Sequence, residues 1–235
     1  DINLTYSSIA REYLISEGID PDTVIKTGSP MYEVINYYKE KIDKTKIVTE
    51  LGLKQHEYFI VSCHREENIT NNVMFENFSN ILNSLAEKYK FPIVVSTHPR
   101  TRQRVEENKD KFNDLIQFVK PLGFSDYVNL QINEKAVRSD SKNKTEESPT
   151  PTPPAINIRE AHERPEGMEE ASVMFTGMSS ERVHQALEIL ETQPRDDNRL
   201  LLPVNDYLAP SVSEKVARII LSYTDYINRT VWKKY

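Results

Sequence analysis

Six short apolar runs, rich in β-branched residues, recur along this chain and constrain its fold more than any other feature. Runs of four or five such residues have the length of strands that are buried on both faces, as in parallel sheets. The runs are Tyr58–Ser62, Ile93–Ser96, Ile116–Val119, Ala136–Ser139, Ala155–Ile158 and Val173–Thr176.

Helical patterns lie between these runs. Between Val73 and Leu85, and again between Val183 and Leu190, apolar residues repeat at spacings of three and four, as on one face of an amphipathic helix. Alternation of strand and helix is typical of parallel sheets in which helices make the crossovers. The sequence therefore predicts an α/β fold, a Rossmann-like parallel sheet with helices on both faces.

The two ends of the chain fall outside this alternation. We expect a helical lead-in over residues 1–50, a main domain over 51–209 and a C-terminal helical segment over 210–235. The predicted elements of the ends are helices at Tyr6–Glu17 and Met31–Asp43, a short segment at Val24–Thr27 between them, and a final helix at Ser211–Tyr226.

Charge and composition exclude several classes of function. The net charge of −6 argues against a general nucleic-acid binder, which needs a cationic surface. No apolar run approaches the ~18 residues of a membrane span. The single cysteine, Cys63, excludes an intrachain disulfide and a cysteine metal cage, and the first residues lack the pattern of a signal peptide. We therefore expect a cytoplasmic protein that binds neither nucleic acid nor membrane.

Polar residues follow several of the predicted strands. In open parallel sheets, ligands bind beyond the carboxyl ends of the strands. We therefore expect His64, His98, Asp140–Ser141 and Glu160–Arg164 to converge on one crevice. Spacing alone leaves two interpretations open for both histidines, because each could bind an anion or simply end a strand in a solvated polar turn.

Two further sequence features each suggest more than one kind of site. Phe124 and Tyr127 could hold a nucleobase, because an aromatic face can stack on one. They could equally be core residues, since they lie three apart on a predicted helix. His162–Glu163 does not fit the zinc pattern H-E-x-x-H, because Glu166 stands where that pattern needs the second histidine.

Several of these segments together resemble the non-hydrolysing UDP-N-acetylglucosamine 2-epimerase family. The stretch from Ser139 to Gly167 is similar to its D-S-G-[GT]-x-x-E-E and E-R-P-E segments, and S-C-H-R-E-E-N and P-L-G-F-S-D-Y-V are similar to two of its other loops. Lys142 and Asn143 stand where the family has glycine, and glycine or threonine. Prolines between Pro149 and Pro154 interrupt a helix that continues in the family.

The resemblance implies one half of a glycosyltransferase-B-like two-domain fold, the half that binds UDP. It is greatest to the UDP-N-acetyl-L-fucosamine synthases of that family, which serve capsule or O-antigen synthesis in the bacterial cytoplasm. The implied reaction eliminates UDP and adds it back with inversion at C2 of the sugar. Because the family's sugar-side carboxylates come largely from the other domain, we expect this chain to be inactive alone.

The resemblance also implies roles for individual residues. His64 is expected on the leaving-group side of the reaction, and Phe124 and Tyr127 at the uracil. It implies neither a cofactor nor a metal. The residues expected to bind the UDP-sugar are His64, His98, Phe124, Tyr127, Ser141, Glu147 and Arg164.

Two alternatives to the epimerase remain at this stage. In one, the chain is a non-catalytic module whose altered diphosphate loop no longer holds the nucleotide sugar. In the other, it is a related glycosyltransferase. The expected ligand is UDP or a UDP-N-acetyl amino sugar. A homodimer is also expected, because apolar residues of the end helices would be exposed in an isolated chain. These residues are Tyr6, Leu14, Val216, Ile220 and Tyr223.

Overall fold

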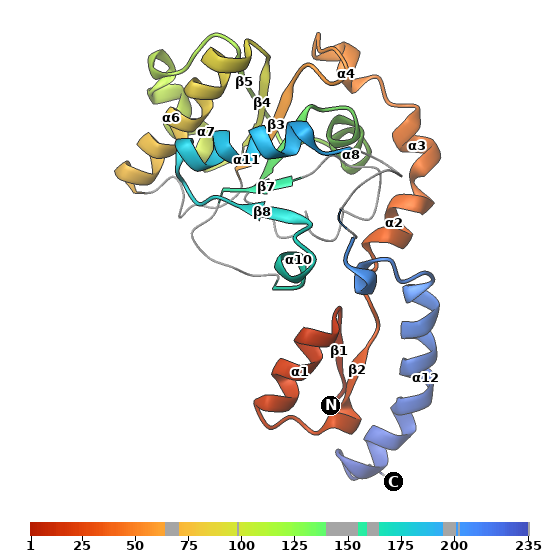
Figure 1. Cartoon of the computed structure of the whole chain (residues 1–235). Coiled ribbons are helices and arrows are strands. Elements are labelled where there is room, and N and C mark those ends of the chain that lie inside the picture. Colours follow the sequence, from red (N-terminus) through yellow and green to blue (C-terminus); the bar gives the residue numbers. More distant parts are fainter. Residues whose placement is uncertain are drawn as a thin grey trace.

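A six-stranded parallel sheet forms the centre of the main domain (Figure 1). The computed structural model describes residues 1–63, 71–97, 99–139, 155–158, 165–194, 201 and 203–234. All six predicted strands are present, with ends that differ by at most one residue from the prediction. They are β3 (Phe59–Cys63), β4 (Ile93–Thr97), β5 (Ile116–Val119), β6 (Ala136–Ser139), β7 (Ala155–Asn157) and β8 (Val173–Phe175).

The order of the strands across the sheet is β5-β4-β3-β6-β7-β8. From β3 the chain moves outward to β4 and β5, and then returns to place β6 on the other side of β3. The direction of winding therefore reverses between β3 and β6, which is the arrangement of a doubly wound Rossmann-like sheet. The predicted fold class is confirmed.

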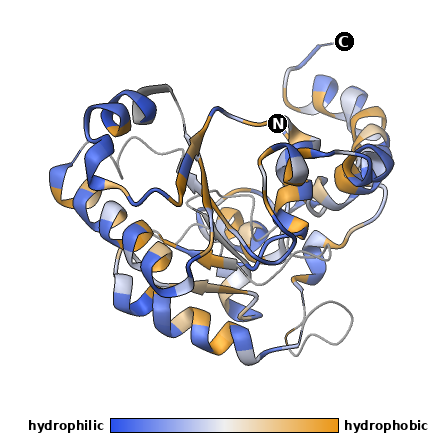
Figure 2. Cartoon of the chain, turned by 90° about the horizontal axis from the view of Figure 1, so that it is seen from above, coloured by the Kyte–Doolittle hydropathy of each residue, from blue (hydrophilic) through white to orange (hydrophobic). Residues whose placement is uncertain are grey.

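Two layers of helices cover the sheet, and side chains alternate between them along each strand. Val61 belongs to the core cluster formed with α6 (Asn72–Tyr89) and α11 (Ser180–Thr192). Its neighbour Ile60 belongs to the cluster on the opposite face, formed with α8 (Phe124–Ile132) and α4 (Ile47–Glu50). Figure 2 shows orange strands in the middle and helices striped blue and orange around them.

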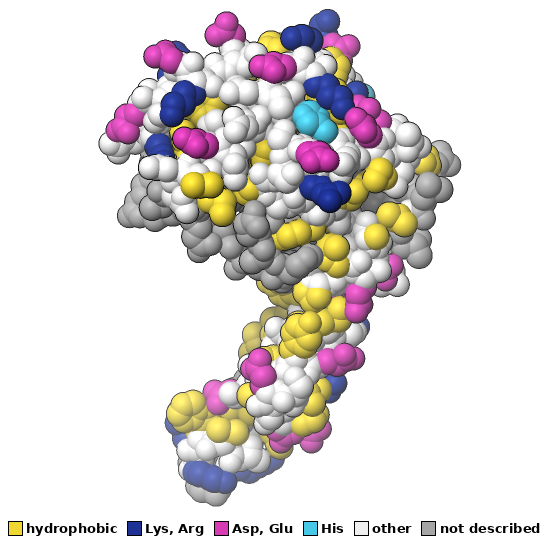
Figure 3. Space-filling model, turned by 60° about the vertical axis from the view of Figure 1, so that its left-hand side comes forward, with side chains coloured by type: hydrophobic (Ala, Val, Ile, Leu, Met, Phe, Trp, Pro, Cys, Tyr) yellow, Lys and Arg dark blue, Asp and Glu magenta, His cyan; other side chains and the backbone are white. Residues whose placement is uncertain are grey.

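The lead-in contains a small second sheet. β1 (Asn3–Thr5) pairs in parallel with β2 (Val24–Lys26), and α1 (Ser8–Ser16) lies between them in the chain, followed by a 3-10 turn at Pro21–Thr23. α12 (Val212–Thr230) runs beside these strands (Figure 1). We call residues 1–27 together with α12 the end lobe, and Figure 3 shows it projecting from the main domain.

The lead-in differs from the prediction in two ways. The predicted helix at Met31–Asp43 is divided into α2 (Met31–Tyr37) and α3 (Lys39–Asp43), because Tyr38 leaves the helical conformation with φ −92° and ψ 4°. β1 was not predicted. α1 begins only at Ser8, where the Ser7 hydroxyl accepts the Ala10 N–H at 3.1 Å as an N-cap.

Gly28 and Asp206 fix the junction between the end lobe and the main domain. Gly28 has φ +87°, and a Cβ there would collide with Ala209 and lie 3.0 Å from the Asp206 carbonyl oxygen, so only glycine fits. The Asp206 carboxylate accepts the Ser8 backbone N–H at 2.8 Å and pairs with Lys26 Nζ at 2.5 Å. Burial alone would raise the pKa of Asp206, but these two partners hold it below its ordinary value.

The stability of the end lobe should therefore decrease at low pH. A lowered pKa means that the ionised Asp206 stabilises the fold above the ordinary carboxyl pKa of about 4, and that this contribution is lost as pH falls through the lowered pKa. Because Lys26 is partly exposed, we expect Asp206→Asn to cost only about 1 kcal/mol at pH 7 and to flatten the acid dependence.

Trp232, the single tryptophan of the chain, lies at the end of the lobe, so its fluorescence during urea unfolding at pH 7 and pH 3 measures this effect. Its indole donates to the Asp1 carboxylate, and Asp1→Asn is therefore the matched control. An equally steep acid dependence in the Asp206 variant would contradict the assignment.

Gln131 of α8 is buried at an energetic cost. Its side chain has 0% exposure, and among the described residues neither amide atom has a hydrogen-bond partner. An unpaired buried amide destabilises a fold by about 1–3 kcal/mol. We expect Gln131→Met to raise the free energy of unfolding by about 1 kcal/mol, as measured by urea denaturation. Gln103→Met on the exposed face of α7 (Pro99–Glu107) should leave it unchanged.

Candidate functional site

A row of small polar residues crosses the sheet close to its carboxyl edge. In the strand register Ser96 of β4 pairs with Ser62 of β3, Ser62 pairs with Ser139 of β6, and Ser139 pairs with Asn157 of β7. Ser62 and Ser96 continue the face on which Ile60 and Val94 pack, because side chains alternate along a strand. Both serines therefore lie on the side of the sheet that α8 covers.

Two buried side-chain oxygen atoms in this row have no hydrogen-bond partner among the described residues. Ser62 has 0% exposure, and its hydroxyl has no hydrogen-bond partner among the described residues. The same holds for the buried side-chain oxygen of Asn157. Buried polar atoms normally have partners.

α8 begins at the same edge, after the loop that follows β5. Tyr127 packs against the core cluster on this face, whereas Phe124, the first residue of α8, remains 38% exposed. The ring of Tyr38 meets the Phe124 ring edge-on, with centroids 5.8 Å apart. Tyr127 is thus partly buried in the core, whereas part of the Phe124 ring is exposed to solvent. The N-cap of α8, Gly123, supplies no side-chain hydrogen bond to the helix.

The other predicted site residues lie outside the described residues. They are His64, His98, Ser141, Glu147 and Arg164.

Their places in the chain are nonetheless fixed by the strands. His64 follows β3 directly, His98 follows β4, and Asp140 follows β6. The strands β4, β3 and β6 are neighbours in the sheet and run parallel, so their carboxyl ends share one edge. The predicted convergence of His64, His98, Asp140–Ser141 and Glu160–Arg164 on one crevice stays a prediction.

One residue near the site was not assigned a role from the sequence. Glu166, in the first turn of α10 (Pro165–Glu169), is only 5% exposed, and its Oε1 accepts a hydrogen bond from the Ser7 hydroxyl. It is the last residue of the E-R-P-E segment, which was its only signal in the sequence. The partner Ser7 lies 159 positions away in the chain, and no local pattern could indicate it.

Two classes of site receive no support from the described part of the chain. Within it, no group of three or more His, Cys, Asp or Glu side chains is arranged to hold a metal ion. Its helices also include none that is both long and apolar enough to cross a membrane.

Comparison with known proteins identifies the family. The sequence model described as UDP-N-acetylglucosamine 2-epimerase matches residues 1–221. The chain belongs to this family. The solved UDP-N-acetylglucosamine 2-epimerase from Rickettsia bellii is 44% identical, superposes with a TM-score of 0.91 and covers 100% of this chain.

More distant members of the epimerase family agree. The Methanocaldococcus jannaschii UDP-GlcNAc 2-epimerase, solved in complex with UDP-GlcNAc and UDP, is 25% identical over 94% of this chain with a TM-score of 0.81. The curated sequence of an epimerase from that organism is 27% identical over 81% of this chain. The chain spans 54% of the length of that curated relative and 62% of the Rickettsia structure.

Proposed function

We propose that this chain is the UDP-binding half of a UDP-sugar 2-epimerase. The observation that carries the proposal is the reversal of the strand order at β3 in a chain of this family, because ligands of open parallel sheets bind beyond the carboxyl ends of the strands at such a reversal. The solved Methanocaldococcus jannaschii epimerase is in complex with UDP-GlcNAc and UDP. Within the family, the resemblance of the sequence motifs favours a UDP-N-acetyl-L-fucosamine synthase acting in capsule or O-antigen synthesis in the bacterial cytoplasm.

The proposed ligand groups follow the order of the loops. Arg164 would meet the diphosphate with its two-pronged guanidinium, and Ser141 with its hydroxyl and backbone. Glu147 would accept hydrogen bonds from the ribose hydroxyls. Phe124 would place its exposed ring against the uracil, while Tyr127 supports the base site from the core.

In the proposed reaction a base removes the proton on C2 of the sugar, and the bond from C1 to the UDP oxygen breaks. The products of this step are UDP and a 2-acetamidoglycal. UDP then adds back at C1 while a proton returns to the opposite face of C2. His64, with His98 beside it in the pocket wall, would stabilise the charge that develops on the leaving diphosphate. We assign the sugar-side base to the part of the relatives that this chain does not span.

The diphosphate loop is the part of the proposed site that departs most from the pattern of the family. Glycine allows backbone amides to approach a pyrophosphate closely, and Lys142 and Asn143 carry side chains at those positions. Asparagine tolerates a left-handed conformation better than lysine does. The clustered prolines also shorten the helix that would orient Glu147.

Titration of UDP into the purified chain by calorimetry tests the proposal. We expect the chain to bind UDP, and the variant Lys142→Gly/Asn143→Gly to bind it about tenfold more tightly, because closer amides add roughly one charge-assisted hydrogen bond. Ser148→Gly, in the same segment, is the matched control for added flexibility. Binding only by the restored variant would favour the alternative of a disabled, non-catalytic module, and no binding by either would reject the nucleotide site.

Catalysis should be absent from the chain alone. With UDP-N-acetylglucosamine in D2O, we expect neither exchange of the C2 proton nor release of UDP, because we assign the acid–base groups for the sugar to the part of the relatives that this chain does not span. Proton NMR measures the exchange, and the Rickettsia bellii epimerase is the positive control. Exchange by the isolated chain would overturn this assignment.

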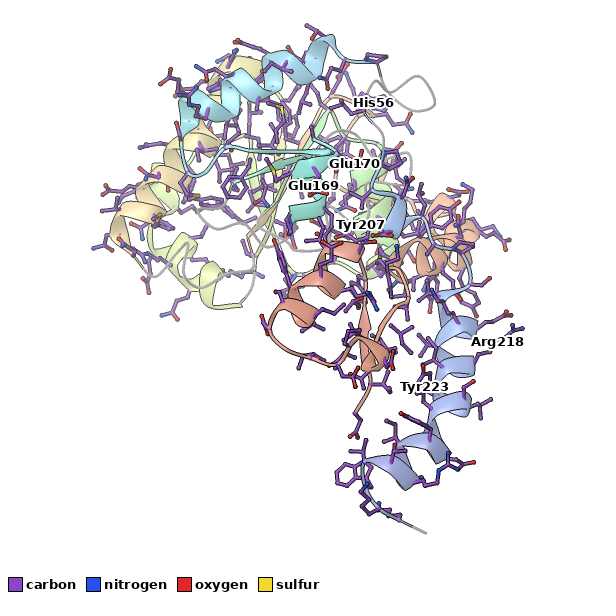
Figure 4. All side chains as sticks on the ribbon, turned by 60° about the horizontal axis from the view of Figure 1, so that its bottom comes forward. His56, Glu169, Glu170, Tyr207, Arg218 and Tyr223 are labelled. Carbon is purple, nitrogen blue, oxygen red and sulfur yellow. The ribbon has the colours of Figure 1, made fainter. Side chains whose placement is uncertain are left out.

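The exposed surface of the end lobe supports the proposed self-association. A groove of about 320 Å³ between β1 and α12 is lined by apolar residues that include Leu4, Ile220 and Trp232. Ile220 is 57% exposed and Trp232 56%. In Figure 4, Tyr223 points from α12 toward the lead-in strands and Arg218 points away from them.

Light scattering on the sample used for catalysis should therefore show a dimer or larger species.

A further inference from the structure

The rings of Tyr38 and Phe124 meet where the lead-in helices contact α8. Their centroids lie 5.8 Å apart and their planes are inclined by 65°, which is an edge-on arrangement. Tyr38 lies between α2 and α3, whereas Phe124 is the first residue of α8. The pair therefore joins two segments that are distant in the sequence.

A buried contact holds these helices together. Ile35 of α2 and Ile42 of α3 form one core cluster with Val128 of α8. The side-chain amide of Asn129 also donates a hydrogen bond to the Ile42 carbonyl oxygen at 2.9 Å. Figure 1 shows α3 beside α8. The two aromatic rings thus belong to helices whose relative position is fixed by the core.

The aromatic pair continues the faces that form this contact. Tyr38 lies three positions after Ile35 and four before Ile42, and the Ile42 N–H donates to the Tyr38 carbonyl oxygen at 2.9 Å. Phe124 lies four positions before Val128 on α8. Residues at spacings of three and four share one face of a helix. The rings therefore extend the buried contact toward the amino end of α8.

Both rings remain open to solvent at this end of the contact. Tyr38 is 39% exposed and Phe124 38%, whereas the three residues of the buried cluster are at most 5% exposed. Edge-on pairs of aromatic rings attract one another beyond the burial of their surfaces, so Tyr38 restricts the orientations of the Phe124 ring. Phe124 is thus held by an aromatic neighbour while part of its surface is accessible to a ligand.

The place of Phe124 relative to the sheet agrees with a ligand-binding role. α8 begins after the loop that leaves the carboxyl end of β5, and β5 pairs with β4 in parallel. In open parallel sheets ligands bind beyond the carboxyl ends of the strands. The segment that carries Phe124 therefore leaves the sheet at the same edge as the segments after β3 and β4.

We propose that Tyr38 is a positioning residue for the nucleobase of the ligand, because it orients the Phe124 ring on which the base stacks. This inference rests on the proposed function, which places Phe124 at the uracil. The ligand chemistry is that of a planar base, whose face stacks on an aromatic side chain. A ring that is oriented before the ligand arrives loses less freedom on binding, and this raises the affinity.

A double-mutant cycle on the full chain tests the role of Tyr38, with UDP binding measured by calorimetry. We expect Phe124→Leu to weaken UDP binding about tenfold, because the stacking contact is lost. Tyr38→Leu should weaken it about threefold, because the Phe124 ring remains but is no longer held. When Phe124 is already leucine, Tyr38→Leu should have no further effect, since it acts through that ring.

Two further variants control for the fold. Tyr38→Phe keeps the ring and should restore most of the affinity that Tyr38→Leu loses. Tyr13→Leu removes another exposed tyrosine, on α1 of the end lobe, and should leave UDP affinity unchanged. Urea unfolding of each variant identifies any loss of affinity that comes from a destabilised fold.

The outcomes separate this inference from the proposed function. Equal weakening by Tyr38→Leu with and without Phe124 would overturn the inference, because the effect would then not pass through the ring. Unchanged UDP affinity in either single variant would overturn it as well. If neither the wild-type chain nor Lys142→Gly/Asn143→Gly binds UDP, the proposed function is rejected and the role of Tyr38 with it. If only the latter variant binds, the same cycle in that background decides.

Discussion

The reversal of winding at β3 is the constraint on which the rest of this molecule depends. All six strands run parallel, so every loop that follows a strand leaves from the same edge. The chain departs from β3 toward β4 and later returns on the side of β6, and open parallel sheets bind ligands at such a reversal of strand order. Ser62 and Ser139 pair across the two strands at this reversal.

The main domain could be predicted from the sequence because its strands are buried on both faces. Such strands are apolar throughout, and Ile60 and Val61 both have 0% exposure although they face opposite layers. The lead-in could not be predicted in the same way. β1 has three residues, Asn3–Thr5, with a single apolar side chain, and its partner β2 begins at Val24. No local pattern marks a strand that exists through such a distant pairing.

The same difference separates the parts of the site that could be predicted from those that could not. The place of His64 or His98 after a strand is a property of the chain, so it follows once the strands are recognised. The row formed by Ser62 and Asn157 depends on the register between strands, and the bond from Ser7 to Glu166 depends on the approach of two separate parts of the fold. Phe124 and Tyr127 lie on one helix but differ in burial, which the spacing of three residues could not indicate.

The end lobe depends on a small number of contacts with the main domain. A parallel pair of three-residue strands buries too little apolar surface to be stable by itself, and isolated two-stranded sheets are marginal even when longer. The lobe therefore keeps its strands through their packing beside α12, and its position through specific contacts at Gly28, Asp206 and Ser7. An element held by a few contacts responds strongly to each of them. Since Ser7 also caps α1, a shift of Glu166 changes the start of that helix as well as its distance from α10. The Ser7 hydroxyl thus caps α1 in the end lobe and also donates a hydrogen bond to Glu166 of α10 in the main domain.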